Sequence, residues 1–250
     1  MSFSFLRVAA IVMFVSAAQI RAADLPIIAR ARAYLGTEAA LDGINVIHYR
    51  GTVVSTDSSD PLKPRRENIE IVVEKPDRER VTARSAERIE STGLDGYEAW
   101  QRVTDAKDPS KWNQVLLAPE VVKKLRAQTW ENIGFYRGLE RRGGVLRDEG
   151  LTTVDGVACR KVAFVHAPDI IFYHYFAAAT GKAVLVETSG VSIRFQGEML
   201  VNGVRFAQTL TQVNDLGHGR SRTIVTTFDT ITVNDSIPDS YFSVPLLTAQ

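Results

Sequence analysis

The sequence predicts a mainly β protein of the α+β class, in which a strongly curved antiparallel sheet of about ten strands forms a half-barrel covered by two helices. Most of the chain after residue 44 alternates apolar and polar residues, which is the period of half-buried strands. Asp-Gly at 155–156 and Asn-Gly at 202–203 separate alternating segments, and such pairs suit the tight turns of antiparallel hairpins. A single sheet this wide curls, so we expect a concave apolar face.

Two segments break the strand period and have the spacing of amphipathic helices. In residues 26–42, Pro26 suits a first helical turn, Gly36 ends one helix, and Thr37 can cap a second short one. In residues 119–133 the apolar side chains fall along one side of a helix and the charged side chains along the opposite side. Two helices are few for so wide a sheet, and a gap left between them and the sheet would be an apolar cavity.

The N-terminus has the layout of a secretory signal peptide. Arg7 precedes an apolar run over residues 8–18, which is shorter than the about 20 residues of a membrane span, and the small residues Ala22 and Ala23 follow. We therefore expect residues 1–23 to be removed and residues 24–250 to form one periplasmic domain. The single cysteine of the chain, Cys159, excludes an internal disulfide.

Catalytic and metal-binding patterns are not found in the sequence. The net charge of +1 gives no reason to expect a nucleic-acid partner. The chain has no Gly-x-Ser-x-Gly elbow and no phosphate-binding glycine-rich loop, and its four histidines lack the spacing of metal ligands. The carboxylates Asp229, Asp235 and Asp239 near the C-terminus invite comparison with a metal or catalytic group, but a final strand that carries Asp229, followed by turns at Asp235 and Asp239, explains them better as parts of a structural clasp. We expect no catalytic residue, no metal and no cofactor.

The candidate lining of the cavity consists of apolar and aromatic side chains on strand-like segments. Each lies on an apolar side of an alternating run, although such residues could also fill an ordinary core. The candidates are Ile69, Ile71, Val73, Trp100, Phe164, Phe195, Met199 and Phe206.

Seven short motifs follow one another along the mature chain. They are YLGTEAALDGI, HYRGTVV, EKPDRERV, LDGYEAW, FYHYFAAATGKAVLVE, VNGVRFAQTL and ITVNDSIPDSYFSVP. Each motif is short and degenerate, but their order resembles that of the periplasmic outer-membrane lipoprotein-sorting proteins, which have the fold of the lipoprotein carrier LolA.

The resemblance implies a half-barrel with a helical lid that holds acyl chains of a lipoprotein. It also implies passage from an inner-membrane release complex to an outer-membrane acceptor. In the carrier a basic residue before a strand-ending proline helps to hold the lid closed, and Lys75 occupies that position here, without the planar fork of arginine. We expect a monomeric, non-catalytic periplasmic carrier or binding protein for lipoprotein acyl chains or lipid. The alternatives are an envelope protein-interaction module with a filled core and, third, a lipid hydrolase.

Overall fold

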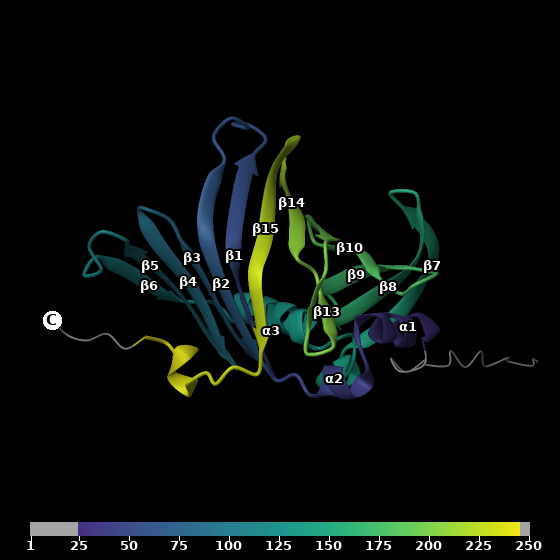
Figure 1. Cartoon of the computed structure of the whole chain (residues 1–250). Coiled ribbons are helices and arrows are strands. Elements are labelled where there is room, and N and C mark those ends of the chain that lie inside the picture. The colour runs from purple at the N-terminus through teal and green to yellow at the C-terminus, as the bar shows by residue number, and fades with distance from the viewer. Residues whose placement is uncertain (1–24, 246–250) are drawn as a thin grey trace, which may run out of the picture.

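A computed structural model describes residues 25–245 and confirms the mainly β architecture with a large, open, curved antiparallel sheet (Figure 1). The expected signal peptide, residues 1–23, lies outside the described residues. Within residues 25–245 no helix is both long enough and apolar enough to cross a membrane.

The first half of the chain contributes six strands. They are β1 (Val46–Asp57), β2 (Arg65–Glu74), β3 (Arg78–Arg84), β4 (Arg88–Asp95), β5 (Glu98–Asp105) and β6 (Trp112–Leu116).

The second half contributes nine more strands. They are β7 (Val145–Val154), β8 (Val157–Ala167), β9 (Ile170–Ala177), β10 (Ala183–Thr188), β11 (Val191–Gln196), β12 (Met199–Val201), β13 (Val204–Phe206), β14 (Thr209–Gly217) and β15 (Arg220–Val233).

Thirteen of these strands form one sheet in the order β6-β5-β4-β3-β2-β1-β15-β14-β11-β10-β9-β8-β7. Each half is a meander of antiparallel neighbours, and the pairing of β1 with β15 joins the two halves at the centre of the sheet. In Figure 1 two arms of the sheet diverge from this central pair. The sheet is not closed into a barrel, since β6 and β7 remain its edges.

The hairpin at Asn202-Gly203 departs from the expected meander. It joins β12 to β13 in a separate two-stranded sheet, while β11 pairs directly with β14. The turn itself forms as expected, with positive φ at Asn202 (47°) and Gly203 (79°). The local signal therefore predicts the hairpin, whereas its place outside the main sheet depends on contacts with the core.

Three α-helices occupy the two expected segments. They are α1 (Pro26–Leu35), α2 (Glu38–Asp42) and α3 (Pro119–Ile133). Pro26 and Pro119 stand in the first turns, where a missing N–H costs nothing, and the side chain of Thr37 accepts a hydrogen bond from the Ala40 amide at 3.2 Å. Gly36 follows α1 as expected.

The helix α3 crosses one face of the sheet, which we call the inner face (Figure 1). Near its start Val122 packs with Leu94 and Ala99, and near its end Ile133 joins a core cluster with Val73. Farther along the sheet Trp130 packs with Phe164 under α1. A single helix thus contacts both arms of the sheet, and α1, α2 and the β12–β13 hairpin complete the cover.

The C-terminal segment covers the opposite face, which we call the outer face. Phe242 is fully buried there with Val46 and Val72, and its carbonyl accepts a hydrogen bond from the Trp100 indole at 2.9 Å. Gly93 pairs with Trp100 and makes room for the indole, because a Cβ on Gly93 would lie 2.4 Å from its ring.

The three carboxylates of this C-terminal region have separate surroundings. Asp235 bonds to His48 Nδ1 at 3.1 Å, Asp239 accepts from Arg78 Nη1 at 2.7 Å, and Asp229 is exposed on β15. The segment is therefore a structural clasp.

Candidate functional site

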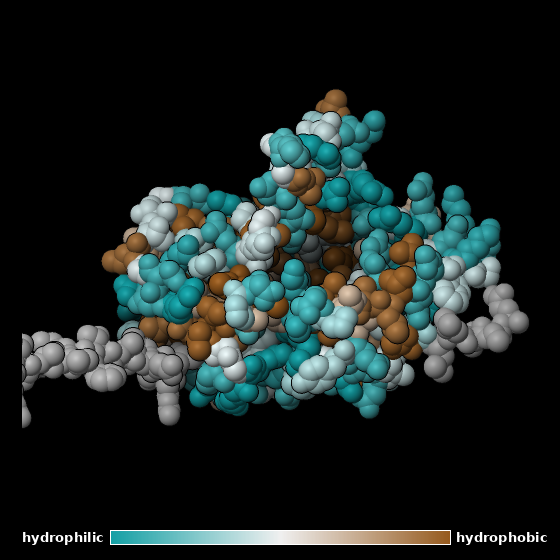
Figure 2. All heavy atoms as spheres, turned by 180° about the vertical axis from the view of Figure 1, so that it is seen from behind, coloured by the Kyte–Doolittle hydropathy of each residue, from teal (hydrophilic) through white to brown (hydrophobic). Residues whose placement is uncertain are grey.

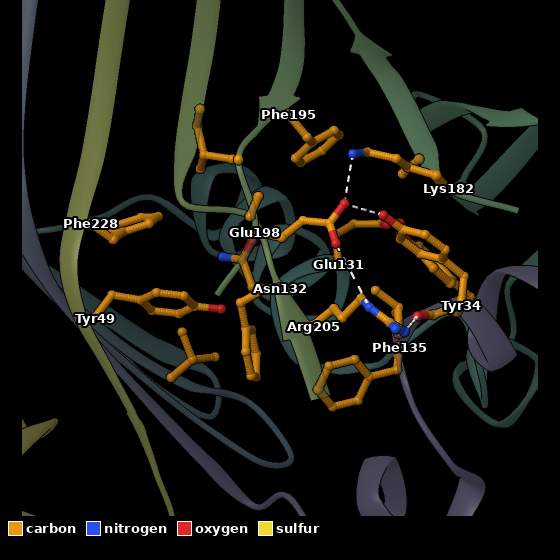
Figure 3. A pocket seen from close by; sticks show the side chains of 18 of the residues that line it. Tyr34, Tyr49, Glu131, Asn132, Phe135, Lys182, Phe195, Glu198, Arg205 and Phe228 are labelled. Atoms are coloured by element: carbon orange, nitrogen blue, oxygen red, sulfur yellow. Dashed lines mark hydrogen bonds and ion pairs between the residues drawn. The ribbon is translucent and has the colours of Figure 1, made fainter. Parts of the chain in front are cut away.

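A cavity of about 210 Å³ lies between the inner face of the sheet and the segments that cover it. Viewed from behind, the surface is hollowed near its centre and the hollow is lined by apolar side chains (Figure 2). Figure 3 shows the cavity itself, with aromatic rings around most of its circumference. The strand side chains of its wall are Tyr49, Ile71, Val73, Phe195, Leu210 and Phe228.

Strand register brings these side chains together. Ile71 and Val73 are two residues apart on β2 and so point to the same face, and Ile71 pairs with Tyr49 of β1. Phe195 of β11 pairs with Leu210 of β14 in the same way. The alternating pattern therefore supplies one continuous apolar wall across five strands, because Phe228 of β15 lies between the two pairs.

The covering segments provide the facing wall. Phe206 comes from the β12–β13 hairpin, Phe135 from the segment after α3, and Leu35 from the end of α1. The Tyr49 ring contacts Phe206 edge-on, with 6.1 Å between ring centroids, and lies 4.7 Å from the Phe228 centroid. These edge and tilted contacts between aromatic rings hold the wall together beyond the burial of its area.

A protonated carboxyl group fits the geometry beneath this wall. Glu79 of β3 accepts from the Asn132 amide at 3.1 Å and lies 2.6 Å from the Thr129 hydroxyl, which also lies 2.9 Å from the Leu125 carbonyl. The hydroxyl has one proton, so both contacts are satisfied when Thr129 donates to Leu125 and Glu79 donates to Thr129. Burial raises the pKa of Glu79, which favours this protonated form. Burial also raises the pKa of Tyr49, so the cavity wall is uncharged there.

The mouth of the cavity is polar, in contrast to its walls. Glu198 accepts a hydrogen bond from Lys182 Nζ at 2.8 Å and another from the Tyr34 hydroxyl, and Arg205 Nε approaches it at 3.7 Å (Figure 3). Hydrogen bonds from Lys182 and Tyr34 hold the pKa of Glu198 below its ordinary value. The mouth therefore carries two cations around one carboxylate.

A buried carboxylate on α3, that of Glu131, lines the cavity and lies between two histidines. Glu131 Oε1 is 2.6 Å from His166 Nε2, Oε2 is 2.7 Å from His174 Nε2, and the three side chains are 5 to 8% exposed. Burial alone raises the pKa of Glu131, but the two histidines more than offset this and leave the pKa below its ordinary value. The cluster attaches α3 to β8 and β9. Among residues 25–245 no group of three or more His, Cys, Asp or Glu side chains is arranged to hold a metal ion.

Four of the eight residues that the sequence predicts for the cavity line it. They are Ile71, Val73, Phe195 and Phe206. Two more lie close to this wall without lining the space. Ile69 is half-buried on the same face of β2 as Ile71, and Met199 pairs with Phe206 in the hairpin and packs against the core.

The remaining two lie elsewhere, which corrects the expectation for them. Trp100 is fully buried on the outer face, under the C-terminal segment. Phe164 is fully buried in a separate cluster with Trp130 and Phe176 under α1. Alternation shows that a strand has two faces but does not show which face borders the cavity.

The cavity is also lined by residues outside these eight candidates. Tyr49, Phe228 and Leu210 lie on alternating strands, and Tyr49 is two residues from Ile47 within the run INVIHYRG. That alternation could have identified Tyr49. Nothing local indicates Phe135, which follows the last turn of α3.

Lys75, the lid-latch candidate that the resemblance implies, lies near the segment that follows α3. The Lys75 ammonium lies 5.8 Å from the Phe135 ring centroid, and burial lowers its pKa. Within residues 25–245 it forms no ion pair or side-chain hydrogen bond. We call α3, the segment after it and the β12–β13 hairpin the lid, and Arg32 of α1 contacts this lid by donating from Nη1 to the Phe135 carbonyl at 2.6 Å.

Two crystal structures show a similar fold. One is a DUF1329 family protein from Desulfovibrio piger, with a TM-score of 0.56, 10% identity, and coverage of 87% of this chain and 95% of the other. The second is a LolA superfamily protein from Nitrosomonas europaea, with a TM-score of 0.56, 10% identity, and coverage of 87% and 96%. No family model and no curated protein matches the sequence. The chain therefore has a LolA-like fold.

Proposed function

We propose that this chain is a monomeric, non-catalytic periplasmic protein that binds one acyl chain of a lipid or lipoprotein in the cavity between sheet and helices. The observation that carries the proposal is the continuous apolar wall from Val73 of β2 to Phe195 of β11, which faces an unfilled space under α3 and the hairpin. Each methylene transferred from water to such a wall contributes about 0.8 kcal/mol.

The size of the cavity limits the ligand. Its volume of about 210 Å³ is smaller than the roughly 300–1,000 Å³ of sites for drug-sized ligands. We therefore infer that one chain, or part of one, enters in this state, and that several chains would require the lid to move. The polar mouth formed by Lys182, Glu198 and Arg205 is suited to the polar, solvent-exposed end of such a ligand.

Calorimetric titration of the mature protein with 1-dodecanoyl glycerol, an uncharged single-chain lipid, tests this proposal. Ala207 lines the cavity, and Ala207→Trp should fill it and weaken binding at least tenfold, which corresponds to about 1.4 kcal/mol. Ala158→Trp adds the same side chain at an exposed position of β8 and should bind like the wild type.

Circular dichroism shows whether each variant is folded. If Ala207→Trp fails to fold, Leu210→Trp on the neighbouring wall serves instead. Absence of binding to the wild-type protein, or binding that both cavity variants leave unchanged, would refute the proposal.

A carrier role requires transfer in addition to binding. We propose that the bound chain passes from an inner-membrane release complex to an outer-membrane acceptor. Native mass spectrometry of protein purified from its own envelope should then show acylated protein bound to it. Recovery of free lipid alone would support binding without lipoprotein transfer.

A further inference from the structure

We propose that the chain has a second ligand site, beside the N-terminal half of α3, which binds a phosphate-bearing amphiphile such as a phospholipid. The site consists of a basic pocket and an adjoining apolar groove. Neither shares a lining residue with the cavity described above, so the proposal does not depend on that cavity being a binding site.

The basic pocket has a volume of about 500 Å³. Lys123 and Arg126 reach it from α3, Arg141 and Arg142 from the short 3-10 helix Leu139–Arg142, and Asp77 from the turn after β2. Four cationic side chains therefore line the pocket together with a single carboxylate.

The acidic groups around the pocket do not balance these cations. Asp77 is shared, since Arg126 Nη2 lies 2.8 Å from one of its oxygens and Arg142 Nη2 lies 2.6 Å from the other. Glu120 pairs with Lys123 at 2.9 Å, and Asp169 also acts on Lys123. Within residues 25–245 the Arg141 guanidinium forms no ion pair. Two arginines on one carboxylate and a third without a partner leave an excess of positive charge.

Arg126 is held in an orientation that suits an anion. Its guanidinium lies 3.9 Å from the centroid of the Tyr97 ring, and its Nη2 lies 2.8 Å from Asp77. Stacking of this kind fixes the plane of the guanidinium, and a fixed planar fork binds phosphate oxygens through two parallel N–H bonds. A phosphate in the pocket would supply acceptors for Arg126 and Arg141.

The apolar groove, of about 450 Å³, begins at the same stacked pair. Tyr97, Lys123 and Arg126 line both spaces, and Ala99, Leu117 and Val122 continue the groove. Two large side chains on its rim are unusually open to solvent, Tyr97 at 79% and Leu116 at 70%. Exposed apolar surface beside concentrated positive charge is complementary to a molecule with a chain and an anionic head.

Calorimetric titration with dodecyl phosphate below its micellar concentration tests the proposal, with inorganic phosphate as the head group alone. We expect dodecyl phosphate to bind at least tenfold more tightly than inorganic phosphate. The double variant Arg141→Gln, Arg142→Gln should bind dodecyl phosphate at least tenfold more weakly than the wild type. It should leave 1-dodecanoyl glycerol binding at the cavity unchanged.

The matched control is Arg147→Gln, which lies in the same basic stretch, pairs with Glu149 at 3.4 Å and does not line the pocket. It should bind dodecyl phosphate like the wild type. Because Arg142 also holds Asp77, the single variant Arg141→Gln, at an exposed residue, serves if the double variant does not fold.

Three results would overturn the proposal. Equal affinity for inorganic phosphate and dodecyl phosphate would show an anion site without a chain site. Dodecyl phosphate binding that is lost in Ala207→Trp but not in the arginine variants would place the ligand in the cavity. Equal loss in Arg147→Gln and Arg141→Gln would show attraction by overall charge.

Discussion

Arg32 and Phe135, which are 103 residues apart in sequence, form the contact that joins the first helix to the lid of the cavity. The Arg32 guanidinium donates to the Phe135 carbonyl and, from Nε and Nη2, to both oxygens of Glu38 at 2.9 and 2.6 Å. The Arg32 side chain is only 6% exposed, so these bonds satisfy a charge that would otherwise be buried without partners. Phe135 lines the cavity, which connects this contact directly to the site.

We predict that Arg32→Met lowers the free energy of unfolding by about 2–3 kcal/mol, because it removes charge-assisted hydrogen bonds from a buried position. Urea unfolding measures the change. Arg137→Met is the matched control, since Arg137 pairs with the same Glu38 but is half exposed, and we expect it to cost less than about 1 kcal/mol. Equal losses in the two variants would show that the Phe135 contact contributes nothing.

Glu79→Gln tests the protonated carboxyl beneath the cavity. The pKa of Glu79 is raised in the folded protein, so its stabilising contribution is complete below the unfolded value of 4.5 and is lost as pH rises through the folded value. A glutamine can donate to Thr129 and accept from Asn132 without a proton to lose. We expect the variant to be at least as stable as the wild type at neutral pH and equal to it near about pH 4. A less stable variant at neutral pH would contradict a neutral Glu79.

For Glu131→Gln we expect the opposite pH dependence of stability. The folded pKa of Glu131 is lowered, so its contribution is present above the unfolded value of 4.5 and is lost as pH falls through the folded value. The variant should lose about 2–3 kcal/mol of unfolding free energy near neutral pH, since two bonds to buried histidines are weakened. The difference from wild type should shrink in acid. Glu120→Gln, at an exposed residue of the same helix, should remain near the wild-type stability at both pH values.

Phe242→Ala tests the C-terminal clasp. The ring is fully buried against Val46 and Val72, and truncation of such a ring costs about 3–5 kcal/mol. Thermal unfolding followed by tryptophan fluorescence measures the loss and reports the exposure of Trp100, which lies against this segment. Leu151→Ala, at a side chain 73% exposed, is the control. Equal stability of the two variants would show that packing of the C-terminal segment on the sheet does not stabilise the protein.

Much of the local structure follows from the sequence alone. Pro26, Gly36 and Thr37 delimit the N-terminal helices, and the helix over residues 119–133 has the expected bounds. Strand alternation places Ile71 and Val73 on one face. These features depend on residues a few positions apart, and the sequence alone gives their conformational preferences and spacing.

Only the tertiary structure decides which face of each strand borders the cavity and what covers it. Trp100 and Ile71 are both predicted from alternating segments of the sequence to line the cavity, but Trp100 lies beneath the C-terminal clasp and only Ile71 faces the lid. The attachment of Glu131 to His166 and His174, and of Arg32 to Phe135, joins residues 35 to 103 positions apart. Such pairs form only when the whole sheet has assembled and α3 has packed on it, and the alternation within one strand does not specify which helix or loop will cover each of its faces.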